Sequence, residues 1–155
     1  MYKKRLIDIR TKCDLKQKEI SKLLGLGNEV YGHYEREETI IPIKHLNYVC
    51  NYFNVSLDYV FEFCDVLNYK NAVPTISKEL QRERLKQLRN EYGLTQQELA
   101  DSINVGKSTI GDYERMAKII ATPFLYDICR KYNISADYLL GKIDEPKYIR
   151  KWLLC

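Results

Sequence analysis

The chain repeats itself once, without a gap, over most of its length. The segment from Arg5 to Phe63 aligns with the segment from Arg84 to Lys142, so RLIDIRTKCDLKQKEISKLLGLG faces RLKQLRNEYGLTQQELADSINVG and NVSLDY faces NISADY. Roughly 18 of about 59 paired positions are identical, as expected of a fixed-period repeat. We therefore expect two copies of one small module, which present two similar surfaces.

Composition restricts each module to a compact helical unit. Each copy has about 60 residues, near the lower limit for a self-supporting core, and a hydrophobic fraction of 45% excludes a disordered chain. No apolar run is long enough to span a membrane, and the N-terminus lacks the apolar stretch of a signal peptide. We therefore expect a cytoplasmic protein that does not enter the membrane.

The five cysteines show neither a CxxC pair nor a Cys/His ligand spacing, which argues against a metal site. Cys50 and Cys129 occupy equivalent positions in apolar helical stripes, so both are expected to be small core residues. No motif in the chain implies a cofactor.

The net charge of +4 is modest and uneven along the chain. Residues 1–67 sum to about zero, residues 68–142 to about +3 and the tail to about +1. A weak positive field suits a nucleic-acid partner but does not identify one, because many other proteins have similar sums.

Helical periodicity and capping residues predict five short helices in each copy. In the second copy Leu85, Leu88 and Tyr92 recur at helical spacing and predict the first helix. Thr95 and Glu98 then form a capping box that begins the second helix. The fifth helix of each copy begins at a serine cap.

A tight turn is predicted between the second and third helices. Asn104 and Gly25 occupy the same repeat position, and asparagine and glycine are the residues that most easily adopt a left-handed conformation. The third helix of the second copy is predicted from about Lys107 to Arg115. A short helix, a tight turn and a second short helix together form a helix-turn-helix.

At these residues the sequence resembles a known family. LTQQELADSINVGKSTIGDYER is similar to the helix-turn-helix of the Cro and phage-repressor family, the xenobiotic-response-element-like bacterial regulators, and LKQKEISKLLGLGNEVYGHYER resembles it too. The trailing segments IPIKHLNYVCNYFNVSLDYVFEF and ATPFLYDICRKYNISADYLLGK look like the family's fourth and fifth helices. The resemblance implies an all-α fold of two tandem five-helix, lambda-repressor-like DNA-binding domains with a short C-terminal helical tail.

The resemblance also implies that double-stranded DNA is bound with the third helix of a copy in the major groove. The glutamine at the start of the second helix would bind a phosphate, and exposed residues of the third helix would read base edges. The phosphate-binding residues would be Gln17 and Gln96. The base-reading residues would be Asn28, Glu29 and His33 in the first copy and Lys107, Ser108, Thr109 and Asp112 in the second. Arg36 and Arg115 would lie near the phosphate backbone of the DNA.

Some residues shared by the copies are expected to be structural. Arg10 and Glu35 are spaced as Arg89 and Glu114 are, and the resemblance implies a partly buried ion pair that joins the first helix to the third. Tyr34 and its counterpart in the second copy are expected in the core.

The first copy departs from the family's pattern. Lys16 replaces the threonine cap, and Glu29 places an acid where a phosphate would approach. Glu37 and Glu38 follow the third helix, where the family commonly has glycine and a basic residue, and the second copy has Met116 there. We therefore expect the second copy to be the better DNA reader.

The repeat sets the expected boundaries, which are 1–67 for the first domain, 68–79 for a linker, 80–143 for the second domain and 144–155 for a C-terminal tail helix. In the tail, Ile149, Trp152 and Leu153 share one helical face. This face is expected either to pack on the second domain or to form a dimer contact.

Two functions remain open from the sequence. The first is a sequence-specific DNA-binding transcriptional regulator of bacterial or phage type, with repression the expected outcome, in which two units or a homodimer span two half-sites. The second is a protein-interaction module, such as an antirepressor or an antitoxin-like partner, that keeps the fold with weak or no DNA binding. An enzyme is not expected, since the chain has no Walker loop, HExxH or GxSxG motif, and no small-molecule substrate is evident.

Overall fold

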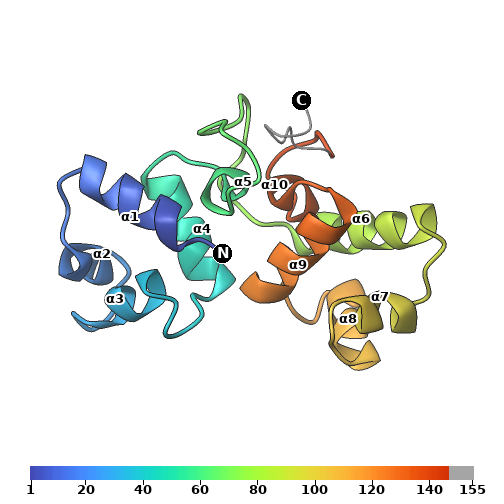
Figure 1. The fold of residues 1–155 in the computed structure, drawn as a ribbon. Helices are drawn as coiled ribbons and strands as arrows, with labels where there is room; N and C mark the ends of the chain where they lie inside the picture. Colours follow the sequence, from blue (N-terminus) through green and yellow to red (C-terminus); the bar gives the residue numbers. More distant parts are fainter. Residues whose placement is uncertain (147–155) are drawn as a thin grey trace. The chain divides into compact units, whose positions relative to one another are not determined.

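The computed structural model describes residues 1–146, and over that range its regular secondary structure consists of ten helices with no strand (Figure 1). The chain divides into two compact units, one covering Met1–Lys70 and the other beginning at Asn71. Each unit contains five helices. The predicted all-α fold of two tandem five-helix units is confirmed.

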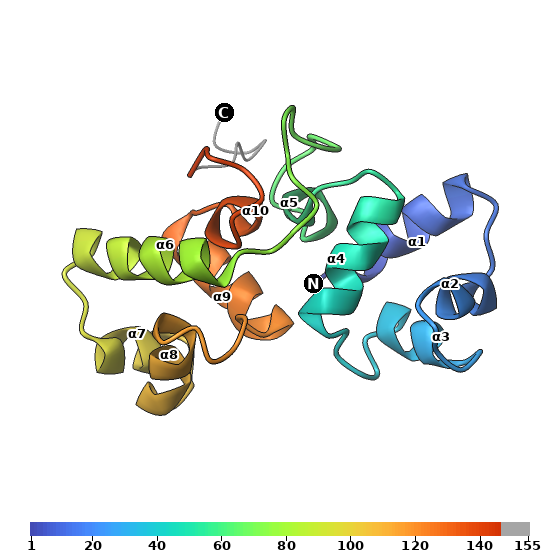
Figure 2. The ribbon, with the colours of Figure 1, turned by 180° about the vertical axis from the view of Figure 1, so that it is seen from behind.

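The helices follow one another in the same order in both units, as Figure 2 shows from the opposite side. The first unit contains α1 (Lys3–Lys12), α2 (Gln17–Leu23), α3 (Val30–Glu35), α4 (Ile43–Tyr52) and α5 (Leu57–Val60). The second unit contains α6 (Lys78–Glu91), α7 (Gln96–Ser102), α8 (Lys107–Glu114), α9 (Thr122–Tyr132) and α10 (Ala136–Leu139). Within the described range, none of these helices is long and apolar enough to cross a lipid bilayer.

The segment between the units packs as part of the second unit. The N–H of Val73 donates to the carbonyl of Lys142 at 2.9 Å, and the N–H of Ser77 donates to the carbonyl of Leu140 at 2.9 Å. Ser77 then caps α6 through its side-chain oxygen. The end of the predicted linker (68–79) therefore belongs to the first helix of the second unit.

The predicted tail helix lies almost wholly outside the described residues. Of its range (144–155) only the first three residues are described, and these are not helical. The expected apolar face formed by Ile149, Trp152 and Leu153 also lies outside the described part of the chain.

The structural repeat continues to the end of the described chain. The N–H of Ser135 donates to the carbonyl of Pro146 at 2.9 Å. At the equivalent place in the first unit, the N–H of Ser56 donates to the carbonyl of Leu67 at 2.6 Å. The segments after α5 and α10 therefore follow the same path.

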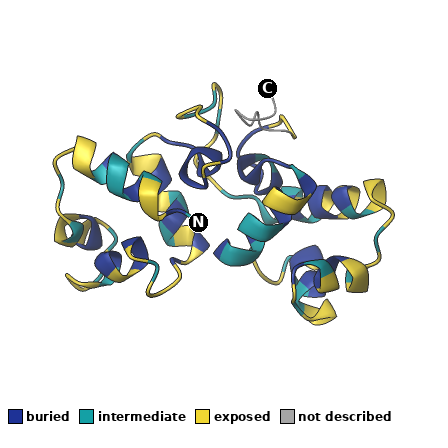
Figure 3. Cartoon of the chain, in the orientation of Figure 1, coloured by how far each residue is buried: buried dark blue, intermediate teal, exposed yellow. Residues whose placement is uncertain are grey.

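Apolar residues that match between the repeats form the two cores (Figure 3). Cys50 and Cys129 are fully buried in α4 and α9, which confirms them as core residues. Tyr34 and Tyr113 are buried as well, which confirms their predicted place. Their burial fixes which side of α3 and of α8 faces outward.

Capping residues start the helices where the sequence predicts. The N–H of Glu98 donates to Thr95 Oγ1 at 3.1 Å, and the N–H of Thr95 donates to the Glu98 carboxylate at 2.7 Å, which completes the predicted capping box. In the first unit the side chain of Lys16 has no acceptor atom for the N–H of Glu19. Only the other half of the capping box remains, in which the backbone N–H of Lys16 donates to the Glu19 carboxylate at 2.6 Å. The predicted loss of a side-chain cap at α2 is confirmed.

A buried ion pair ties the first helix of each unit to the third. Arg10 donates through Nε and Nη2 to the two carboxylate oxygens of Glu35, at 2.8 and 2.9 Å. Arg89 makes the same two-pronged contact with Glu114, at 2.8 and 3.2 Å. Both glutamates are buried, so the ion pair that the resemblance implies is confirmed in both units.

Removal of one member of the second pair tests its contribution to stability. Glu114→Ala leaves the Arg89 guanidinium without its carboxylate partner, so we expect the second unit to lose about 3 kcal/mol of unfolding free energy. Urea denaturation followed by circular dichroism measures this loss. Glu91→Ala, at an exposed position on α6, is the control and is expected to change stability by less than about 0.5 kcal/mol. Equal losses in the two variants would contradict the account.

The same pair predicts acid sensitivity of the second unit. Burial opposes ionisation, but hydrogen bonds from Arg89 and Gln96 lower the pKa of Glu114 below its ordinary value. A carboxyl whose pKa is lower in the folded chain stabilises the fold above its unfolded pKa of about 4.3, and this contribution is lost as the pH falls. We expect the stability difference between the wild-type chain and Glu114→Gln to shrink between neutral pH and about pH 3. Urea denaturation at each pH measures it, and a constant difference would refute the assignment.

Candidate DNA interface

A tight turn sets α8 beside α7 in the second unit (Figure 1). Asn104 adopts a φ of 56°, in the left-handed region, and the N–H of Val105 donates to the carbonyl of Ala100 at 3.0 Å. Gly25 adopts a φ of 70° at the same position in the first unit. The predicted stop between the second and third helices is confirmed in both units.

The outward side of α8 carries the polar residues that the sequence predicts for this surface. Lys107 and Ser108 are exposed at its start, and Thr109 and Asp112 are half-buried further along. Arg115 is exposed immediately after the helix. The opposite side of α8 is buried in the core, so four of these side chains reach solvent from α8 and Arg115 reaches it from the residue just after the helix.

Asp112 is held by two cations. Its carboxylate accepts from Arg115 at 2.6 Å and lies 3.2 Å from Lys118 Nζ. The hydrogen bond from Lys118 is the main reason that the pKa of Asp112 is lowered. Lys118 is not among the residues predicted for this site. The sequence could have indicated it, because Lys118 occupies the repeat position of the uncharged Thr39.

The two predicted phosphate-binding glutamines join the buried ion pairs. Gln96 Nε2 donates to Glu114 at 2.8 Å, and Gln17 Nε2 donates to Glu35 at 3.0 Å. A side-chain amide has a second N–H, and each glutamine is the first residue of its helix, where backbone N–H groups are unpaired. The carboxylate therefore fixes an amide donor beside a helix N-terminus, an arrangement that suits a phosphate oxygen.

The third helix of the first unit is shorter than the third helix of the second. It begins at Val30, so Asn28 and Glu29 lie in the turn before it. Both residues are exposed, but the prediction that they lie on the third helix is wrong. Their counterparts Lys107 and Ser108 do lie in α8.

A buried serine explains the shorter helix. Ser21 Oγ accepts the N–H of Tyr31 at 2.9 Å and donates to the carbonyl of Asn28 at 3.2 Å. Ala100 has no hydroxyl at the equivalent position in the second unit. The hydroxyl of Ser21 therefore takes up two backbone groups at the point where α3 would otherwise begin two residues earlier, as α8 does.

The remaining predicted residues of the first unit are engaged by an acid. Arg36 Nε donates to Glu38 at 2.8 Å, and His33 Nδ1 lies 2.6 Å from the same carboxylate. The hydrogen bond from Arg36, and then that from His33, lowers the pKa of Glu38 to about 2. Both side chains therefore already have an anionic partner within the chain.

The position after the third helix is left-handed in both units, although neither unit has a glycine there. Glu37 has a φ of 58° and Met116 a φ of 62°. Side chains adopt this conformation at a steric cost that glycine avoids. In the first unit the Glu37 carboxylate accepts the N–H of Tyr2 at 2.9 Å. The acid therefore anchors the start of α1, which gives its departure from the family pattern a structural reason.

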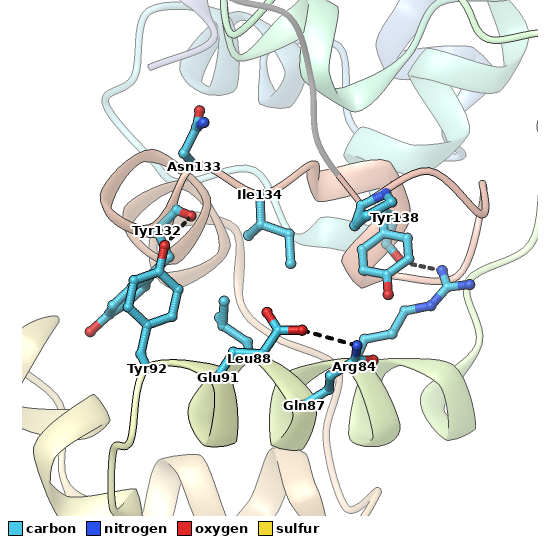
Figure 4. A pocket seen from close by; sticks show the side chains of 10 residues that line it. Arg84, Gln87, Leu88, Glu91, Tyr92, Tyr132, Asn133, Ile134 and Tyr138 are labelled. Carbon is cyan, nitrogen blue, oxygen red and sulfur yellow. Dashed lines mark hydrogen bonds between the residues drawn. The ribbon is translucent and has the colours of Figure 1, made fainter.

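The second unit also contains a pocket between α6 and the corner of α9 and α10 (Figure 4). Its volume is about 260 Å³, and tyrosine and aliphatic side chains form much of its lining. Gln87 Nε2 donates to Glu91 at 3.1 Å. The Tyr92 hydroxyl donates to the carbonyl of Tyr132 at 3.2 Å. These two contacts pair polar groups of four lining residues within the chain.

Ser21→Ala is expected to convert the start of α3 to the form seen in the second unit. Removal of the hydroxyl frees the N–H of Tyr31 to join the helix, so Asn28 and Glu29 should become helical. Backbone chemical shifts measured by NMR report this change. The reciprocal variant, Ala100→Ser, is expected to shorten α8, and unchanged shifts in both variants would show that the serine does not set the helix start.

Comparison with known proteins finds one module in both halves of the chain. A family model described as "Helix-turn-helix" matches residues 6–60 and again residues 85–139. The chain is 41% identical over 64 residues to the uncharacterized HTH-type transcriptional regulator YobD of Bacillus subtilis (strain 168), a match that covers 41% of this chain and 57% of that protein. It is 40% identical over 65 residues to the HTH-type transcriptional regulator ImmR of the same strain, which covers 42% of this chain and 51% of that protein.

The chain spans about half the length of these curated relatives. No solved structure matches it. The two family matches fall on the two five-helix units, and each unit has the turn geometry that separates its second helix from its third. The chain belongs to the helix-turn-helix family, with two tandem copies of the family's module.

Proposed function

We propose that the chain is a DNA-binding transcriptional regulator in which the second unit reads the major groove through α8. The contrast between the two third-helix surfaces is the observation that carries the proposal. The surface of α8 presents Lys107 at its start and Arg115 and Lys118 beyond its end, against the single acid Asp112. Cations on a helix surface attract the phosphate backbone, and lysine donates to the edge of guanine.

The neighbouring residues supply the remaining contacts in this proposal. Ser108 and Thr109 follow Lys107 on the first turn of α8 and can donate to bases or phosphates. Gln96, oriented by Glu114, donates to a phosphate from the start of α7. On binding, Arg115 and Lys118 release Asp112 and contact the phosphate backbone of the DNA. The carboxylate of Asp112 can then accept from a cytosine amino group.

The first unit contributes less to DNA binding in this account. Its third helix begins after Asn28 and Glu29, and Glu38 holds Arg36 and His33. A phosphate repels a nearby carboxylate, whereas a basic patch on a protein attracts one. This cluster favours a protein-binding role for the first unit alongside DNA reading by the second.

The names of the two relatives support regulation of transcription as the biological role. Repression is the outcome we propose, because a protein that occupies a short duplex site excludes other proteins from that site. The two relatives support the class of transcriptional regulator. The cations around α8 support the choice of α8 as the helix that reads DNA.

Two alanine variants distinguish the units. Lys107→Ala removes a donor and a positive charge, so we expect DNA affinity to fall by about 10-fold to 100-fold, which corresponds to roughly 1–3 kcal/mol. Asn28→Ala is expected to change affinity by less than about twofold, because Asn28 lies in the turn before α3 and the first unit contributes less to binding. Fluorescence anisotropy with a duplex recovered by genomic pull-down measures both affinities.

The salt dependence of the wild-type chain serves as the control. Log affinity should fall linearly with log salt concentration, because phosphate contacts release counterions. A flat salt dependence would contradict DNA binding. Equal losses in Lys107→Ala and Asn28→Ala would contradict the assignment of the reading to α8.

A further inference from the structure

The repeat allows the same surface to be compared in two sequences that share one fold. In the first unit, apolar and aromatic side chains of α2, of α4 and of the residue after α4 meet at one surface. They are Ile20, Leu23, Tyr48, Val49, Tyr52 and Phe53. The rings of Tyr52 and Phe53 meet edge to face, with their centroids 5.0 Å apart.

Three large side chains of this surface remain exposed. Leu23 is 38% exposed, Tyr48 46% and Tyr52 53%. We call the surface formed by these three residues the α2–α4 face. Isolated apolar residues are common on protein surfaces, but a contiguous group of large ones marks a binding surface more often than a bare monomer surface.

The second unit builds the same place from polar residues. The counterparts of Leu23 and Tyr52 are Ser102 and Lys131, and Asp127 replaces Tyr48. Lys131 Nζ donates to the carbonyl of Ser102 at 3.0 Å. The fold therefore does not require an apolar α2–α4 face, and its character in the first unit needs another explanation.

A hydrogen bond in the second unit strengthens this comparison. The Tyr132 hydroxyl donates to Ser102 Oγ at 2.8 Å, which links α9 to α7. Phe53 and Leu23, at the equivalent positions, have no polar atom to form such a link. The second unit presents polar and charged groups to solvent between these helices, and the first presents apolar groups there.

We propose that the α2–α4 face binds the same face of a second copy of the chain. A two-fold contact brings identical surfaces together, so a face with a charged centre would repel its own copy. The centre of this face is neutral. Each tyrosine hydroxyl can both donate and accept, so tyrosines from two copies can satisfy one another.

The charges beside the face suit the same occupant. Two charged residues are exposed on α2 near Leu23. Glu19 lies four residues before Leu23, and Lys22 lies immediately before it. A two-fold contact can set the acid of one copy against the base of the other, which a partner of uniform charge could not match. The dimer carries two second units and therefore two copies of α8, as two DNA half-sites require.

The second unit also supplies the substitutions that test this interface. Leu23→Ser, Tyr48→Asp and Tyr52→Lys together give the first unit the residues found at the same places in the second, where the fold accommodates them. Sedimentation equilibrium of the full chain without DNA measures association. We expect the wild-type chain to be a dimer and the triple variant to dissociate at least about tenfold more readily. Its circular dichroism spectrum should be unchanged.

A leucine elsewhere on the first unit provides the matched control. Leu67 is 57% exposed and lies outside the α2–α4 face, so Leu67→Ser should leave the dimer intact. Should the triple variant lose helical signal, Tyr52→Lys alone replaces it, because the side chain of Tyr52 is the most exposed of the three.

Two outcomes overturn the proposal. One is a wild-type chain that stays monomeric at every concentration. The other is a folded face variant that dimerises as tightly as the wild type. Association is measured without DNA, so a monomeric chain that still binds DNA in a salt-dependent way would leave the proposed function standing while this inference fails.

Discussion

The contact between an arginine of the first helix and a glutamate of the third holds the third helix in place in each unit. The guanidinium holds both carboxylate oxygens, and a glutamine from the second helix donates to the same carboxylate. Three helices therefore meet at one buried charge. Loss of the arginine would leave a buried carboxylate unpaired, which is energetically costly, so the pair holds the three helices in one arrangement. The outward residues of α8 are positioned by this arrangement.

The two units use the same scaffold to present different surfaces. Ser21 shortens α3, whereas Ala100 leaves α8 at full length. Glu38 neutralises Arg36 in the first unit, whereas Lys118 adds a cation in the second. Each difference arises from a single side chain, one of them buried in the core and the others exposed. The repeat has therefore kept its buried ion pair and its turns while single side chains around the third helix have diverged.

Most of the fold could be predicted from the sequence because it depends on residues that are close together or present in both copies. The capping box at Thr95 involves residues three apart, and the turn at Asn104 depends on the conformational preference of one residue. The ion pair at Glu114 joins residues far apart in the sequence. It could be predicted only because its spacing recurs and the family resemblance supplies its role.

The parts that could not be predicted depend on where individual side chains point. Ser21 reads as an ordinary helix residue, and nothing nearby in the sequence shows that its hydroxyl binds the backbone ten residues later. The pairing of Asp112 with Lys118 joins a helix to the segment after it, which helical spacing does not predict. The apolar α2–α4 face becomes visible only when the two units are compared position by position in three dimensions.

The central claim is that α8, and not α3, enters the duplex. NMR amide shifts of the full chain, recorded during titration with a mixed-sequence duplex at low salt, test it directly. The account predicts that the largest changes fall on Gln96, on Lys107 to Thr109 and on Arg115, and that they disappear as salt is raised. Shift changes centred on α3, or shift changes that involve neither α3 nor α8, would contradict it.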